Sequence, residues 1–97
     1  MSGKLTFSIA TPDGPVAGGP CEFVVVPTAG GEVGVMADHA ALVAGVVPGE
    51  LRVTIDGAVR GFRIGGGLLD VRDNTVRLLV TTAENNAAED RGRPAGG

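Results

Sequence analysis

The 97-residue sequence has few of the residue types on which catalysis and nucleic-acid binding depend. It contains one cysteine, one histidine and three phenylalanines, and it has neither tryptophan nor tyrosine. Single-stranded nucleic acid is usually held by aromatic stacking and clustered basic groups. Lys4 is the only lysine and the net charge is −3, so neutralisation of phosphates would be weak. Nucleic acid is therefore not expected among the partners.

Disulfide bonding and membrane insertion also have little support in the sequence. Cys21 is the only cysteine and lies beside a valine-rich run, which predicts an ordinary buried thiol in a reducing, intracellular setting. The longest apolar region, residues 33–47, is interrupted by Asp38 and His39 and is shorter than the roughly 20 residues of a membrane-spanning helix. Residues 5–10 are too short for the apolar core of a signal peptide. We expect membrane association only through a partner.

The side chains needed for catalysis or metal binding are missing. One histidine and one cysteine cannot supply the three or four ligands of a zinc site. Ser2 is at the terminus and Ser8 is within an expected strand, so neither suits a nucleophile elbow. The glycines at 65–67 precede a strand-like segment instead of a helix, which favours a tight bend or a close backbone approach over a phosphate loop. No lysine is available at a hairpin tip for acylation, which excludes a biotinyl or lipoyl carrier. We expect no catalytic, cofactor or metal site.

The sequence does contain a series of short segments in which apolar and polar residues alternate, as they do in β-strands. The expected strands are residues 5–10, 16–17, 21–26, 33–36, 50–55, 58–64, 69–72 and 76–81. Residues 21–26 are almost continuously apolar, which predicts burial on both faces, and Pro27 is expected to end that strand. Residues 39–47 permit either a helical turn or a strand, and we prefer a strand.

Turn signals separate these segments. Residues 11–15 and 18–20 carry glycine with proline and predict chain reversals, as do Pro48 and Gly49. Asp56-Gly57 is the strongest hairpin signal, and a second hairpin is expected at Asp73-Asn74. A two-residue loop at the first hairpin would place Arg60 opposite Val53 on the inner face, so its register stays open.

Repeated short strands with turns between them indicate an all-β sandwich or barrel. From Ala83 onward the apolar periodicity stops, and the chain ends in a segment rich in charged residues, glycine and proline. We therefore expect one β domain at residues 1–82 and a disordered polar tail at residues 83–97.

Several motifs occur in the order and spacing of a known family. They are Thr11-Pro12-Asp13-Gly14, Gly31-Glu32-Val33-Gly34-Val35, His39-Ala40 with Leu42, Pro48-Gly49-Glu50-Leu51-Arg52-Val53 and Gly66-Gly67-Leu68-Leu69-Asp70-Val71. Together they resemble the N-terminal domain of the epsilon subunit of F-type ATP synthase, from about Leu5 to about Thr82. The resemblance implies a flattened β-sandwich of about ten strands, in agreement with the pattern above.

The same resemblance implies a non-catalytic subunit of the rotor, in the central stalk of a proton- or sodium-translocating ATP synthase. Such a subunit binds the gamma subunit and the c ring, couples ion transport to ATP synthesis, and lies peripherally on the cytoplasmic face of the bacterial plasma membrane. The implied c-ring contacts are Gly31, Glu32 and Gly34. The implied gamma contacts are Val16, Ala17, Asp38, His39, Ala40 and Leu42.

The sequence departs from the family pattern around the histidine. Ala37-Asp38 stands where the family usually has Pro-Gly, and Ala41 replaces a second proline. Without each proline the unfolded chain has more conformations to lose on folding, which lowers the stability of the folded state by about 1 kcal/mol. Only a short segment follows Thr82, so we expect neither the two inhibitory C-terminal helices nor a nucleotide site.

Two alternatives remain from the residues alone. Glu32 follows two glycines and can be a solvated turn residue or a contact for a basic partner, and His39 can simply satisfy backbone groups of a turn. The competing hypothesis is a small regulatory or ligand-binding β-sandwich unrelated to ATP synthase assembly.

Overall fold

The structure is a computed structural model that describes residues 4–86, and the regular structure in that range consists of ten β-strands. In chain order they are β1 (Leu5–Thr11), β2 (Gly14–Cys21), β3 (Phe23–Thr28), β4 (Gly31–Met36), β5 (Leu42–Val46), β6 (Gly49–Ile55), β7 (Ala58–Ile64), β8 (Gly67–Arg72), β9 (Thr75–Val80) and β10 (Ala83–Asn85). The expectation of an all-β fold of about ten short strands is confirmed. No helix within residues 4–86 has the length and hydropathy to cross a membrane.

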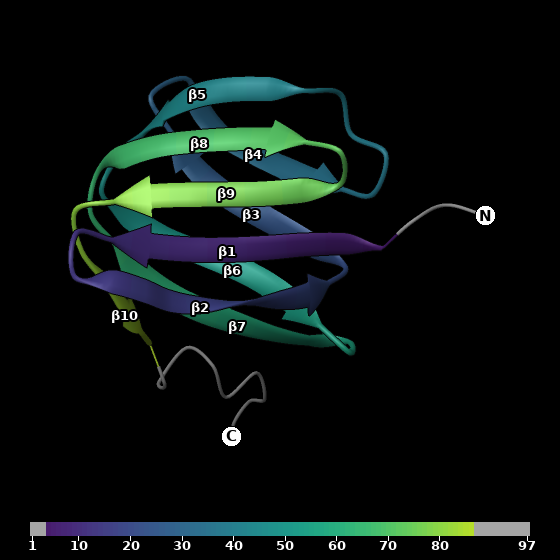
Figure 1. Cartoon of the computed structure of the whole chain (residues 1–97), viewed down its shortest axis with the longest axis horizontal. Helices are drawn as coiled ribbons and strands as arrows, with labels where there is room; N and C mark the ends of the chain where they lie inside the picture. The colour runs from purple at the N-terminus through teal and green to yellow at the C-terminus, as the bar shows by residue number, and fades with distance from the viewer. Residues whose placement is uncertain (1–3, 87–97) are drawn as a thin grey trace.

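The strands form two layers (Figure 1). We call β5, β8, β9, β1 and β2 the front sheet, in that spatial order, and β4, β3, β6, β7 and β10 the back sheet. The sheets are continuous at one corner, where Thr28 of β3 pairs with Val46 of β5. Pairing is antiparallel except between β1 and β9, which run parallel. The result is a flattened sandwich that is closed along one side.

The core lies between the two layers because the alternating apolar residues of each strand face inward. Leu5, Phe7 and Ile9 of β1 are 0–3% exposed, while Thr6 and Ser8 between them are exposed. The same alternation buries Leu51 and Val53 of β6, Leu69 and Val71 of β8, and Val76, Leu78 and Val80 of β9. Phe7 and Phe62 meet across the layers with ring centroids 6.4 Å apart. The alternation in the sequence therefore identifies most of the core.

The two expected hairpins are present. Asp56 and Gly57 both have positive φ, as a type I′ turn requires, and the strands pair Leu51 with Phe62 and Ile55 with Ala58. This register places Arg60 opposite Val53, and Arg60 nevertheless stays exposed at the end of the hairpin. A long side chain can extend past an apolar face to reach water. The Asp73-Asn74 turn likewise joins β8 to β9.

Two expected interruptions turn out to be parts of strands. The predicted turn at 18–20 is wrong, because β2 runs without a break from Gly14 to Cys21. Glycine and proline are tolerated there because β2 is an edge strand with only β1 as a neighbour. Pro27 does not end its strand either, since β3 continues to Thr28. The pairing of β3 with β6 covers only residues 23–25, so a missing N–H at Pro27 removes no bond from that ladder.

Burial of β3 is also one-sided. Val24 and Val26 are fully buried, whereas Phe23, Val25 and Pro27 on the outer face are half-buried. The expected burial on both faces therefore holds only for the inner face.

The boundary of the expected tail is corrected by β10. Ala83 pairs with Ile64 and Asn85 with Phe62, and Asn86 donates its N–H to the Gly61 carbonyl over 2.8 Å. A three-residue edge strand is held by backbone bonds and needs no apolar periodicity, which is why the pattern missed it. The rest of the expected tail, residues 87–97, lies outside the described residues.

Candidate functional site

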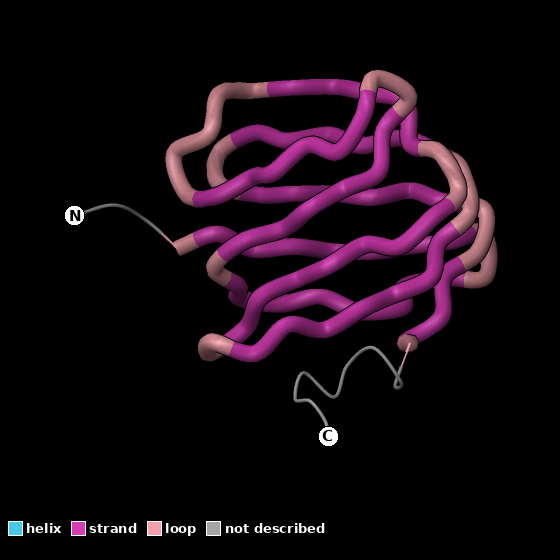
Figure 2. Tube along the Cα trace, turned by 180° about the vertical axis from the view of Figure 1, so that it is seen from behind, coloured by secondary structure: helices cyan, strands magenta, loops and turns pink. Residues whose placement is uncertain are grey.

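The turns of the sandwich gather at two opposite ends, as the view from behind shows (Figure 2). One end, here named the Glu32 end, carries the turns at 12–13, 29–30, 47–48, 65–66 and 81–82. The other, the His39 end, carries the loop at 37–41 and the turns at 56–57 and 73–74. Strand β4 connects the two ends, so the residues expected to meet the c ring and most of those expected to meet gamma are separated along one strand.

At the Glu32 end, the buried Thr28 shapes the turn before β4. Its hydroxyl donates to the Gly31 carbonyl over 2.5 Å and accepts the N–H of Gly30 over 3.2 Å. Gly31 and Glu32 are then exposed at the start of β4. Gly34, further along, lies under the ring of Phe23, where a Cβ would meet that ring at 3.0 Å.

Glu32 is not a free carboxylate, because Arg52 of β6 lies across β3 from it and donates to both of its oxygens, over 3.3 and 3.4 Å. A second carboxylate, that of Glu50, lies 3.6 Å from the same guanidinium. We name these three residues the Glu32 cluster. The Glu32 side chain is 57% exposed, so the pair is weakened by solvent and contributes at most about 1 kcal/mol. Two carboxylates share one arginine, which leaves a net negative charge that a basic partner could complete.

At the His39 end, Met36 to His39 form a turn in which His39 donates its N–H to the Met36 carbonyl over 3.2 Å. The third residue, Asp38, has a φ of 68°, which corresponds to a type II turn. The His39 ring is half-buried, and its Nδ1 lies 2.8 Å from the Ala40 carbonyl. The bond to its own neighbour makes His39 a local turn residue, while Asp38 and Ala40 stay exposed.

The two other residues expected to contact gamma, Val16 and Ala17, lie far from the histidine loop. They belong to β2, and Leu42 belongs to β5, at the opposite edge of the front sheet. Val16 is 40% exposed, but Ala17 and Leu42 are half-buried against the core and present little surface. The outer face of β1, β9 and β8 lies between these two regions.

That outer face carries a row of apolar residues that the sequence interpretation missed. Leu68 pairs with Leu79 and is flanked by Gly45, and Leu79 pairs with Ala10. Leu68 and Leu79 are 45% and 58% exposed. We name Gly45, Leu68, Leu79 and Ala10 the outer row. The signal was present in the sequence, because Leu68-Leu69 and Leu78-Leu79 break the alternation and place one leucine of each pair on the outer face.

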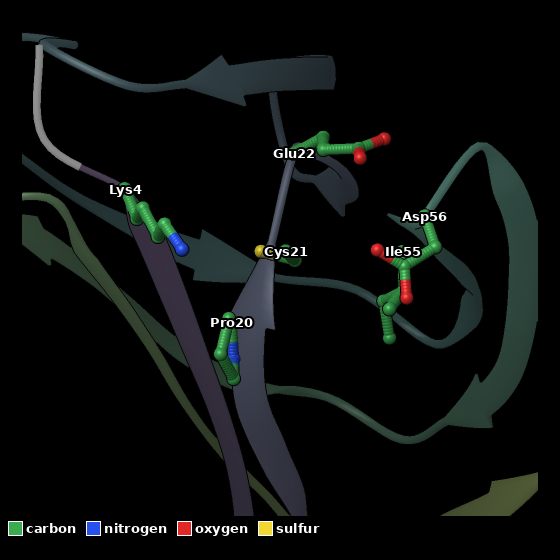
Figure 3. Close-up of a pocket in the computed structure, with 6 residues that line it drawn as sticks. All are labelled: Lys4, Pro20, Cys21, Glu22, Ile55 and Asp56. Carbon is green, nitrogen blue, oxygen red and sulfur yellow. The ribbon is translucent and has the colours of Figure 1, made fainter.

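Two pockets lie on the surface of the sandwich, one beside the outer row and the other at the His39 end. A pocket of about 380 Å³ at the end of the outer row is lined by Ala10, Thr11, Pro12, Gly66, Gly67, Leu79, Val80 and Thr81. Another of about 440 Å³ lies where β2 passes into β3 and is lined by Lys4, Pro20, Cys21, Glu22, Ile55 and Asp56 (Figure 3).

The second pocket offers little chemistry. Burial, and then the charge of Glu22, raise the pKa of the Cys21 thiol, so the thiolate needed for nucleophilic attack is disfavoured. The Glu22 carboxylate accepts a hydrogen bond from the N–H of Gly57 over 3.2 Å and thereby stabilises the β6–β7 turn. Within residues 4–86 there is no group of three or more His, Cys, Asp or Glu side chains placed to hold a metal ion.

Fold and surface together define an all-β sandwich whose distinctive features are exposed surfaces at its two ends and across its front sheet. The family described as ATP synthase, Delta/Epsilon chain, beta-sandwich domain, matches residues 4–86. The chain belongs to this family, and the resemblance drawn from its motifs is confirmed.

Individual relatives agree with this assignment. The chain is 38% identical over 84 residues to the ATP synthase epsilon chain of Desulfitobacterium hafniense, covering 87% of this chain and 64% of that protein. It is 36% identical over 84 residues to the ATP synthase epsilon chain of Carboxydothermus hydrogenoformans, covering 87% and 63%. The chain thus spans less than two thirds of the length of these curated relatives. Membership in the family favours the ATP synthase hypothesis over an unrelated regulatory sandwich.

Solved structures show the same fold. A chain of the Euglena gracilis mitochondrial ATP synthase, in a structure of OSCP, F1 and c-ring, superposes with a TM-score of 0.79 at 26% identity, covering 84% of this chain and 53% of that one. A chain of the Tetrahymena thermophila mitochondrial ATP synthase central stalk and c-ring superposes with a TM-score of 0.73 at 20% identity, covering 86% and 67%. The second similarity concerns the fold alone.

Proposed function

We propose that this chain acts as a non-catalytic epsilon subunit in the central stalk of an F-type ATP synthase. In this role it binds gamma through the front sheet and the His39 end, and the c ring through the Glu32 end. It thereby couples ion transport to ATP synthesis, peripheral to the cytoplasmic face of the bacterial plasma membrane. The proposal rests on membership in the family and on relatives named ATP synthase epsilon chain.

The observation that carries the gamma assignment is the outer row. Val16 and the His39 loop belong to opposite edges of the front sheet, and the exposed leucines Leu68 and Leu79 lie on the strands between them. Exposed apolar side chains grouped on one face favour a protein partner, because their burial removes apolar surface from water. A partner that spans the two expected contact regions therefore covers the exposed leucines together with the neighbouring ion pair of Asp70 and Arg77.

The Glu32 end has a different chemistry. Its Glu32 cluster contains one positively charged and two negatively charged side chains. Charged, solvated contacts of this kind affect the rate and orientation of association more than its strength. This suits contact with a polar surface of the ring, where a basic residue would pair with the excess carboxylate.

The test is association of the full chain with purified gamma subunit, measured by calorimetry. Leu79→Ser should raise the Kd at least about tenfold, since a buried leucine contributes about 1.5–3 kcal/mol. Val59→Ser is the matched control, because Val59 is 39% exposed on β7 of the back sheet. The proposal is wrong if the unmodified chain fails to bind folded gamma at micromolar concentration, or if both variants weaken binding equally.

A further inference from the structure

The turn before His39 lacks the residues that usually make such a turn rigid. A type II turn favours proline at its second position and glycine at its third, where φ is positive. Here those positions hold Ala37 and Asp38, and Asp38 has a φ of 68°. A non-glycine residue in this region is strained, although aspartate tolerates it better than most residues do. Something outside the turn must therefore stabilise it.

Asn74, which lies 36 positions further along the chain, supplies that support. Its side-chain oxygen accepts the N–H of Asp38 over 2.5 Å, and its side-chain nitrogen donates to the Asp38 carboxylate over 3.4 Å. The backbone carbonyl of Asn74 accepts the N–H of Thr6 over 2.9 Å. We name the reciprocal side-chain contact the Asp38–Asn74 clamp. It connects the loop at 37–41 to the β8–β9 hairpin, and the hairpin is anchored in turn to β1.

Asn74 is well placed for this role because of its own conformation. It has a φ of 58° in the two-residue turn after Asp73, which also has positive φ. Both residues are held by the paired strands β8 and β9, where Arg72 is opposite Thr75. The amide therefore projects from a fixed turn, and the less constrained loop is the element that it orders.

From this geometry we infer that Asn74 is a positioning residue for partner binding: its amide holds Asp38 and His39 in the conformation that gamma recognises. The inference rests on the proposed function, because it assigns the loop at the His39 end to the gamma contact. A loop that is already ordered loses less conformational freedom on binding, and this increases affinity without any new contact. Asn74 itself need not touch gamma.

The test uses Asn74→Gly in the full chain. Glycine accepts the positive φ, and an Asp-Gly pair suits a type I′ hairpin, so β8 and β9 stay paired while the amide is lost. The bond from Thr6 is kept because it uses the backbone. In the isolated variant, hydrogen exchange of the His39 amide, which bonds to Met36, should accelerate about threefold to tenfold, as expected for one lost hydrogen bond. The urea midpoint should not fall.

Binding to gamma separates a positioning role from a merely structural one. Asn74→Gly should raise the Kd about threefold to tenfold. Adding Ala37→Pro should return the Kd to within about twofold of the unmodified chain, because proline presets the second position of a type II turn and leaves Asp38 and His39 unchanged. Unchanged exchange at His39 in Asn74→Gly would overturn the clamp. Faster exchange with an unchanged Kd, or no rescue by Ala37→Pro, would overturn its role in binding. Failure of the unmodified chain to bind gamma would reject the proposed function, while the exchange result would still decide the clamp.

Discussion

At the scale of single residues, the close approach of neighbouring backbones explains why some positions hold glycine. The clearest case is Gly67, the first residue of β8, which pairs with Val80 of β9. A Cβ at this position would overlap the carbonyl oxygen of Leu79 and lie 2.7 Å from the Val80 Cα. The neighbouring atoms are backbone and cannot rotate away. The glycines at 65–67 therefore serve a steric purpose, as the sequence indicated.

Gly67→Ala should lower the free energy of unfolding by about 1–3 kcal/mol, because the strands must separate to admit the methyl group. Urea denaturation followed by far-ultraviolet circular dichroism measures the change. The control is Gly45→Ala on the neighbouring strand β5, where no atom lies within 4 Å of the added Cβ. Gly45→Ala should stay within about 0.5 kcal/mol of the unmodified chain. Equal losses for the two variants would contradict the steric explanation.

Cys21 offers a prediction about pH. Burial raises the pKa of its thiol, so the folded state retains the proton more strongly than the unfolded state does. The resulting stabilisation is complete below the unfolded pKa, about 8.5, and is lost as the pH rises through the folded value. Under reducing conditions, the free energy of unfolding should therefore fall more steeply above about pH 8.5 in the unmodified chain than in Cys21→Ala. Parallel curves for the two proteins would show that the thiol does not contribute.

At the scale of elements, the sequence predicted the strands that have one apolar and one polar face. It missed the features that depend on which strands lie side by side. Alternation located β1, β6 and β9, and the Asp56-Gly57 signal located its hairpin. The errors concern strands at the edges of the sheets. Glycine and proline are tolerated in β2 because only β1 pairs with it, and β10 forms through backbone bonds alone.

The candidate site was predictable in part for the same reason. The spacing of motifs indicated Glu32 and His39, and both lie at ends of the sandwich. The partners of these residues were not predictable. Arg52 reaches Glu32 across β3, and Asn74 reaches Asp38 from a distant hairpin, so both contacts depend on strand order. Local sequence patterns do not reveal that order.

The contribution of β10 to the stability of the fold can be tested by introducing a charged side chain into it. Ala83 is half-buried against the core and pairs with Ile64, whereas the next residue, Glu84, is exposed. Ala83→Asp should destabilise the fold by about 1–3 kcal/mol, because a polar group enters a partly apolar site without a partner. Glu84→Gln, the control, should have no measurable effect. If Ala83→Asp matched the control in thermal unfolding, β10 would not be part of the folding unit.

At the scale of the whole molecule, the sandwich separates two surfaces of different chemistry. The outer row is apolar and lies on the front sheet, while the Glu32 cluster is charged and lies on the outer face of the back sheet. The core between them is closely packed and includes residues from both sheets. A rigid body of this kind can hold two partners in a fixed relation, as the proposed coupling role requires.

This separation predicts that the two surfaces act independently. Glu32→Gln should slow association with the isolated c ring about threefold at low salt, because it removes a charge that orients the encounter, and the difference should shrink at high salt. Asp56→Asn is the control, since it makes the same change of charge at the His39 end. Glu32→Gln should not alter the Kd for gamma, and Leu79→Ser should leave the c-ring rates unchanged. In the double variant Glu32→Gln with Leu79→Ser, the effects on assembly of gamma with the c ring should add to within about 0.5 kcal/mol, as expected for sites that share no partner. A larger coupling energy would mean that one partner spans both surfaces, and the assignment of one surface to each partner would then be wrong.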